Sequence, residues 1–198
     1  MDTALLVAII TATASVLSWV INSIFTSWKE KRKEKFEARL EFIDKQLEEL
    51  YGPLAFLVHE GEHSFKSIFR TNRRRWVSLR GDKPIPEEQL ALWIFWVEND
   101  FFPRNEKIKQ LLMEKTHLIE GSKVPESFLH FMEHYNTWKL EHQRWKEEGI
   151  EYSFLSRVKF PEDFNDEVLT TFKSLKKEQN KFLDKIYEKK MKSQSSRI

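Results

Sequence analysis

The sequence predicts an all-α protein, with a single N-terminal transmembrane helix followed by an antiparallel cytosolic helical bundle whose first helix resembles a coiled coil. Three observations carry this prediction. Residues 3–28 contain no charged side chain, and apolar residues in the rest of the chain recur at alternating steps of three and four. Glycine, at 5 residues, is scarce beside 16 Phe and 7 Trp, which is typical of long helices around an aromatic core.

The N-terminal segment predicts a membrane anchor over residues 1–28. A helix needs about 20 apolar residues to cross the hydrocarbon core of a bilayer, and residues 3–28 provide that length. The basic cluster 29–35 follows directly, and such clusters stay on the cytoplasmic side. The only charge before the apolar run is Asp2, which argues against a cleavable signal peptide. We therefore expect a single-pass protein of the inner (cytoplasmic) membrane, with its N-terminus outside and its C-terminal domain in the cytoplasm.

Small residues in this anchor predict self-association. Ala8 and Ala12, and then Ala14 and Ser18, have the small-xxx-small spacing that lets membrane helices approach closely. We therefore expect a homo-oligomer. The alternative is a single helix that bonds its hydroxyl groups to its own backbone.

The rest of the chain predicts one cytosolic helical bundle over residues 29–190 and a disordered basic tail over residues 191–198. The whole chain has 33 basic and 31 acidic residues, and this net charge of +2 argues against a nucleic-acid-binding protein, which usually carries a strong basic excess. There is no cysteine, so disulfides and thiolate metal sites are excluded.

The first cytosolic helix carries an apolar seam of the coiled-coil type. Gly52-Pro53 interrupts it, and we expect a kink or break there because proline removes a backbone donor and clashes with the carbonyl four residues back. The seam can pack within the chain or against another copy. Packing within the chain is favoured because later helices carry similar seams. The seam residues are Phe36, Leu40, Ile43, Leu47, Leu50, Leu54 and Leu57.

Three later helices are predicted to begin at Pro86, Pro125 and Pro161. Proline at the first helical position costs no hydrogen bond, and the acids that follow each proline complement the helix dipole. The first of these helices contains the unbroken apolar run 90–97, which we expect to be buried. Together with a helix that begins near Arg104, the predicted ranges are 86–97, 104–119, 125–148 and 161–190.

The string His59-Glu60-Gly61-Glu62-His63 matches the zincin pattern, in which two imidazoles on one helix face bind zinc and a glutamate acts as general base. His117 would be the third ligand, and His130 and His134 repeat the spacing. The seam register places His59 and His63 outward, in water, and Gly61 weakens a helix that must hold ligands. We therefore expect no catalytic residues and no cofactor, and a membrane-tethered zinc metallohydrolase remains the alternative. His142, at a seam position, is expected to be a hydrogen-bonded core residue.

Two polar groups are candidates for ligand contact. Arginines around an aromatic side chain can hold phosphate or lipid headgroups, and the alternative is a solvated loop whose arginines pair with acids. Carboxylates that directly follow the densest apolar segment can line a pocket, and the alternative is a cap for the next helix. The first group is Arg70, Arg73, Arg74, Arg75, Trp76 and Arg80, and the second is Glu98, Asp100 and Asn105.

Several short strings resemble a family of uncharacterised bacterial proteins with one N-terminal transmembrane helix and a cytosolic helical domain. They are Leu50-Tyr51-Gly52-Pro53-Leu54, Trp96-Val97-Glu98 with Phe102-Pro103 and Asn105, His117-Leu118-Ile119, and Phe160-Pro161. The resemblance covers most of residues 36–175, implies a bacterial membrane setting and transfers no activity. The segment between Gly149 and Phe160 departs from the family, where it is polar.

These features predict a membrane-anchored helical interaction module that has no catalysis of its own. It would serve as a self-assembling adaptor, a sensor or a membrane effector, for example in bacterial defence. The expected partners are the membrane, further copies of the chain, and a cytosolic protein or small anionic ligand.

Overall fold

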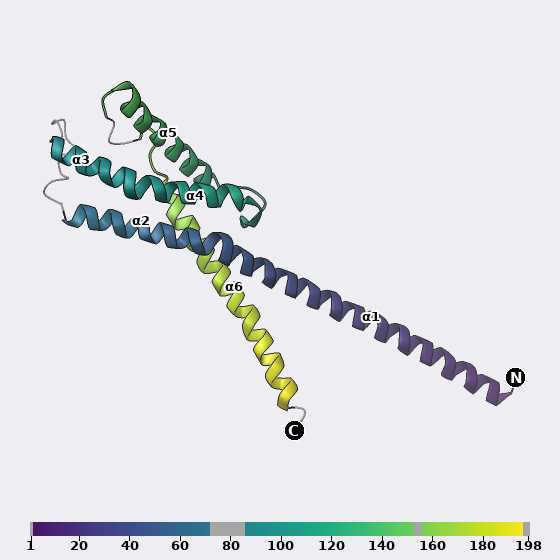
Figure 1. Ribbon diagram of the computed structural model, residues 1–198. Coiled ribbons are helices and arrows are strands. Elements are labelled where there is room, and N and C mark those ends of the chain that lie inside the picture. Colours follow the sequence, from purple (N-terminus) through teal and green to yellow (C-terminus); the bar gives the residue numbers. More distant parts are fainter. Residues whose placement is uncertain (1, 72–85, 153–155, 196–198) are drawn as a thin grey trace. The chain divides into compact units, whose positions relative to one another are not determined.

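The computed structural model describes residues 2–71, 86–152 and 156–195, without the side chains of residues 4–12, 14, 69–71, 189–190, 193 and 195. All regular elements in these residues are helices (Figure 1), so the all-α class is confirmed. The chain forms two compact units, residues 1–42 and residues 43–198. In order, the elements are α1 (Thr3–Gln46), η1 (Leu47–Tyr51), α2 (Gly52–Thr71), α3 (Glu87–Trp96), η3 (Val97–Phe101), α4 (Phe102–Glu114), η4 (Thr116–Leu118), α5 (Glu126–Glu148) and α6 (Glu162–Ser195).

The first unit does not support the predicted membrane span over residues 1–28. Among the residues that the structure describes, no helix combines the length and the apolarity that crossing a bilayer requires. The side chains of residues 4–12 and 14, which form much of the uncharged run, lie outside that description. The boundary between the units, after Phe42, also lies further along the chain than the predicted domain boundary after Trp28.

Each of the two π-turns in the described chain, η1 and η3, ends two residues before a proline, Pro53 or Pro103. The N–H of Gly52 donates to the carbonyl of Leu47, and the N–H of Phe102 donates to the carbonyl of Val97, five residues back in each case. Proline at the next position cannot donate, and its ring crowds the preceding turn. One wider turn relieves that crowding and keeps the helix continuous.

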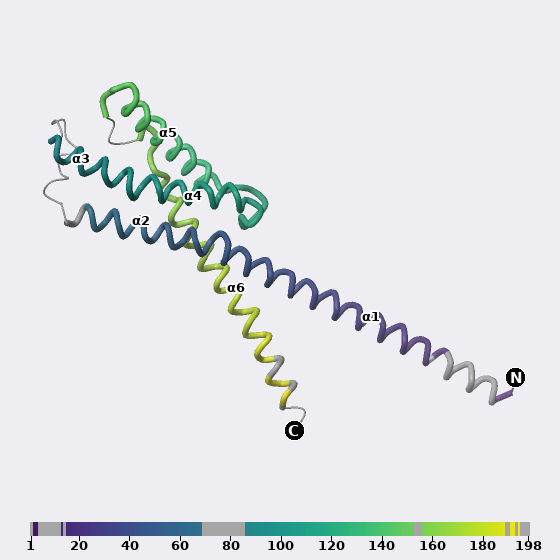
Figure 2. The backbone as a smooth tube through the Cα atoms, viewed as in Figure 1, coloured from purple at the N-terminus to yellow at the C-terminus, as the bar shows by residue number. Residues whose placement is uncertain are grey.

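The predicted break at Gly52-Pro53 is therefore absent, because the chain stays helical from α1 through η1 into α2 (Figure 2). In the same way α3, η3 and α4 join into one helix over residues 87–114, where a separate helix was predicted to begin near Arg104. That second helix ends at Glu114, and a short 3₁₀ turn, η4, follows it.

The helices of the second unit are antiparallel to their neighbours, as predicted. The Phe101 ring lies 6.4 Å from that of Phe65, and Arg104, further along α4, lies against Gly61, earlier in α2. Helix α5 returns along this second helix, with contacts from His142 to Glu98 and from Tyr135 to Glu106. Helix α6 returns along the first, with contacts from Asn165 to Glu62 and from Gln179 to Asp44.

The apolar seam packs within the chain. Ile43, Leu47, Leu50 and Leu54 are buried in the second unit, and Leu57 is half-buried. Two polar contacts fasten the same region to the turn after α4. The buried Gln46 side chain donates to the Leu118 carbonyl at 2.9 Å, and the Glu120 N–H donates to the Tyr51 hydroxyl at 3.0 Å.

The apolar run 90–97 is less buried than predicted. Trp93 and Val97 are buried, while Phe95 is 59% exposed. The run is helical, and only one face of a helix can meet the core at a time. At the other end of the chain, α6 continues to Ser195, five residues beyond its predicted end at residue 190 and into the segment predicted to be a disordered tail.

Replacing Gly52 with alanine should destabilise the second unit by about 1–3 kcal/mol, the usual cost of overpacking. A Cβ atom at this position would lie 2.3 Å from the backbone carbonyl oxygen of Leu47, which cannot move without opening the π-turn. The measurement is chemical denaturation of the full chain followed by circular dichroism. Ser67→Ala, at an exposed position of α2, is the control and should leave stability unchanged. A Gly52→Ala chain as stable as wild type would contradict this reading, and so would a more stable one, which is what helix propensity alone predicts.

Candidate ligand-binding pocket

The zincin-like string does not form a metal site in the structure. His59 and His63 lie on α2 with exposed side chains, and His117 and His130 are exposed as well. Within the described residues, no three His, Asp or Glu side chains are grouped so that they could hold a metal ion. The outward position predicted for His59 and His63 is confirmed.

Gly61, in the middle of that string, has a packing role. A Cβ atom there would lie 3.2 Å from Nη1 and 3.3 Å from Cδ of Arg104. The absence of a side chain at Gly61 therefore lets the Arg104 side chain lie flat against the backbone of α2. Glycine costs helix stability, and here that cost is offset by a close approach between helices.

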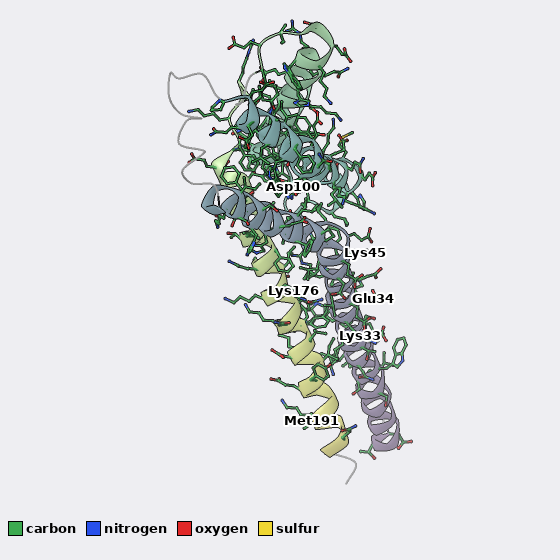
Figure 3. The ribbon with its side chains drawn as sticks, turned by 60° about the vertical axis from the view of Figure 1, so that its left-hand side comes forward. Lys33, Glu34, Lys45, Asp100, Lys176 and Met191 are labelled. Carbon is green, nitrogen blue, oxygen red and sulfur yellow. The ribbon has the colours of Figure 1, made fainter. Side chains whose placement is uncertain are left out.

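Arg104 is a buried cation held by groups from α2 and η3. Its side chain is only 8% exposed, and its Nη2 forms a charge-assisted hydrogen bond with the Asp100 carboxylate. Nη2 also donates to the Ser64 hydroxyl at 3.2 Å, and Nε lies 3.7 Å from the Glu60 carboxylate. A buried charge is expensive unless it is paired and hydrogen-bonded. These contacts therefore favour the observed register between α2 and α4, because another register would leave the buried charge unpaired. Figure 3 shows Asp100 where the helices of the second unit gather.

Arg104 also forms part of the wall of a cavity of about 650 Å³ between α2, α4, α5, the loop before α6 and the start of α6. This volume lies in the range of small-molecule sites, which are mostly apolar with a few placed polar groups. The wall is rich in aromatic side chains: Phe65, Trp93, Phe101, Trp138, Phe160 and Phe164.

Several polar groups of this wall have no protein partner in the described chain. The indole Nε1 of Trp138 and the hydroxyl of Ser156 are buried, and neither forms a hydrogen bond with a described residue. Both side-chain hydrogen bonds of Arg104 are made by Nη2, so Nη1 takes no part in them. Lys159 lines the wall and forms no ion pair with a described residue. Arg104 and Lys159 therefore bring unused donor capacity to the wall, whereas the buried polar atoms of Trp138 and Ser156 are covered by protein.

His134 lies in the same wall and is held neutral by its surroundings. Its Nδ1–H donates to the Val158 carbonyl at 2.6 Å, since that oxygen can only accept. Burial lowers the pKa of His134, and the hydrogen bond to Val158 opposes this only in part. The side chain therefore fixes the loop before α6 over the cavity.

The predicted pocket residues have different positions. Asn105 lines the cavity, and Asp100 lies behind its wall as the partner of Arg104. Glu98 is elsewhere, on the side that faces α5, where it pairs with Lys146 at 2.5 Å and with the buried His142 at 2.9 Å. The Lys146 ammonium, more than any other group, lowers the pKa of Glu98. The prediction of His142 as a hydrogen-bonded core residue is confirmed.

The predicted arginine cluster lies outside the described side chains. Arg73, Arg74, Arg75, Trp76 and Arg80 fall in residues 72–85, which the structure does not describe. Only the backbone of Arg70 is described, in the last turn of α2.

No sequence pattern identified Arg104, Trp138, Ser156 or Lys159 as site residues. One signal was present: Asp100 and Arg104 stand four residues apart, the spacing of an ion pair on one helix face. A second was Gly61, a glycine inside a helix that needs a packing reason. Comparisons with protein-family models, with curated proteins and with solved structures found no match to this chain.

His134 should make the protein less stable as the pH falls below about 6.5, the ordinary imidazole pKa. In that range the unfolded chain binds a proton that the buried ring resists, so unfolding is favoured. The measurement is the melting temperature at pH 7.5 and at pH 5.5. His134→Asn keeps an N–H donor for Val158 but cannot titrate, so its loss of stability between the two pH values should be smaller than that of wild type. His130→Asn, at an exposed position of α5, should behave as wild type, and equal losses in both variants would refute the assignment.

Proposed function

We propose that the protein is a membrane-anchored helical interaction module without catalysis of its own. In this proposal residues 3–28 insert into a membrane, and the helical unit 43–198 binds a small ligand. A partner protein then responds to whether the ligand is bound. The resemblance to bacterial membrane proteins supports a bacterial inner membrane as the setting. Further copies of the chain and a cytosolic protein are the partners that fit this role.

The observation that carries the proposal is the broad exposed apolar surface of α1 over residues 16–28. Residues 3–28 contain no charge, and the polar residues among them, such as Ser15, Ser18 and Asn22, carry only hydroxyl or amide groups. An exposed apolar surface of this kind marks a contact with a membrane or with another protein. The exposed fractions are 61% for Val16 and Leu17, 71% for Trp19, 66% for Ile21, 64% for Ile24, 55% for Phe25 and 66% for Trp28.

The end of this apolar segment has the chemistry of a membrane–water interface. Trp28 is followed at once by Lys29, whose ammonium lies 4.5 Å from the centre of the Phe25 ring. Aromatic and basic residues are enriched at that boundary, with the basic residues on the cytoplasmic side. The orientation that follows puts the N-terminus outside and the helical unit in the cytoplasm.

Binding suits the second unit better than catalysis. The cavity offers aromatic surface and fixed donors, while the charged groups next to it, apart from Lys159, are held in ion pairs. The zinc hydrolase alternative needs His59 and His63 in a cleft, and both side chains are exposed.

The full chain should stay in the membrane fraction of expressing bacteria after an alkaline carbonate wash. The double variant Leu17→Asp with Ile24→Asp should move into the soluble fraction, because both carboxylates would lie in the hydrocarbon region, where one at the helix centre costs about 2.5–3.5 kcal/mol. Its helical unit should keep the wild-type melting temperature, since both changes lie in the other unit.

A double variant with the same two changes at exposed apolar positions of α5, Leu129→Asp with Leu140→Asp, is the control and should remain in the membrane fraction. Release of the wild-type chain by the wash would contradict membrane anchoring. Retention of the Leu17 and Ile24 variant would place the anchor elsewhere in the chain.

A further inference from the structure

We infer that the cavity binds a small organic monocarboxylate whose body is planar and apolar. The inference rests on the proposed function, because it names the ligand of the unit that this function describes. It is carried by three observations: the aromatic wall, the unmet hydrogen-bond donors and the placement of Arg104.

The wall around the cavity fits a planar body. Trp93, Phe101 and Trp138 lie in mutual contact, with ring centres 5.6 Å apart for Trp93 and Phe101 and 6.2 Å apart for Phe101 and Trp138. All of these rings line the cavity, and Phe65 and Phe160 add faces from α2 and from the loop before α6. Aromatic side chains favour offset-stacked and edge-to-face contact with another ring. A flat ring system therefore fills this space with more favourable contact than a branched aliphatic body.

The polar groups of the wall favour an acceptor. Arg104 lines the cavity and has unused donor capacity at Nη1, which lies beside Gly61. Lys159 adds an ammonium group that forms no ion pair with a described residue. Both groups can only donate, so a ligand with only donor groups would leave them unmet, whereas a carboxylate satisfies them.

The charges around the cavity favour a ligand with one negative charge. Most lining cations already have acidic partners: Arg104 has Asp100, and Lys66 has Glu62 at 3.2 Å. Arg157 has Glu141 at 3.0 Å. Lys159 is the lining cation without an acid in the described chain, so it can balance one carboxylate. The guanidinium fork of Arg104 then supplies the directional contact that a carboxylate accepts.

The acidic side chain in the wall does not compete for these donors. Glu62 accepts from Asn165 at 3.3 Å and pairs with Lys66, so its oxygens are already occupied. Burial lowers the pKa of His134, so the neutral ring adds no second positive charge at pH 7.

The test is isothermal titration calorimetry of the full chain in detergent micelles with two probes, naphthalene-1-acetate and naphthalene-1-acetamide. The probes share one planar body and differ in the charge of the head group. Empty micelles give the background for each. We expect the acetate to bind with one molecule per chain and the acetamide to bind at least about tenfold more weakly.

Two variants locate the head group. Lys159→Gln should reduce acetate affinity about threefold to fivefold, because an exposed charge contributes modestly, and should leave acetamide affinity unchanged. Lys107→Gln removes an exposed lysine of α4 outside the wall, and it should change neither affinity. The double variant Asp100→Asn with Arg104→Gln, which removes both charges of the Asp100–Arg104 ion pair, should abolish the preference for the acetate. If this double variant does not fold, the comparison of Lys159→Gln with Lys107→Gln alone tests the position of the head group.

Equal affinity for the two probes, or equal losses in the Lys159 and Lys107 variants, would overturn the inference and leave the proposed function standing. Absence of binding by both probes would overturn the inference and also remove the ligand-binding part of the proposed function. Membrane anchoring is judged separately, by the carbonate wash of the Leu17 and Ile24 variant.

Discussion

The burial of one guanidinium sets the geometry of the helical unit. A charge with 8% of its side chain exposed cannot remain there without partners, and Arg104 obtains them from two different helices. Asp100 comes from its own helix one turn earlier, while Ser64 and Glu60 come from α2. Gly61 gives the side chain the room to reach them. Any change of register between α2 and α4 would leave this cation without compensation, so the contact selects one packing of the two helices.

The π-turns extend the effect of this contact along both helices. Each accommodates a proline without breaking the helix, so each helix continues through the bundle as one element. The turn η3 contributes both Asp100, which holds the guanidinium, and Phe101, which lines the cavity. The family-like strings at Gly52-Pro53 and Phe102-Pro103 lie at these turns, and His117-Leu118-Ile119 lies where Gln46 fastens η4 to the first helix. These strings thus occupy positions that shape the fold.

Periodicity and helix-start signals predicted most of the second unit. The seam from Ile43 to Leu54, the start of α5 after Pro125 and the outward position of His59 depend on neighbours within a few residues, which a sequence displays directly. The π-turns were missed because proline predicts a local break, and only packing of the joined helix makes the wider turn favourable. The cavity was missed for a similar reason. Arg104 donates a hydrogen bond to Ser64, which lies 40 residues earlier in the sequence, and no local pattern predicts that contact.

The most direct test of this account is the ¹⁵N–¹H spectrum of the arginine side chains in the full chain, with the Arg104 signal assigned from its loss in Arg104→Lys. The account predicts that the Arg104 Nε–H exchanges with water far more slowly than those of exposed arginines such as Arg144, because the atom is buried. It also predicts that this signal shifts when naphthalene-1-acetate is added. Exchange as fast as that of the exposed arginines would contradict the burial of the guanidinium on which the packing and the pocket depend.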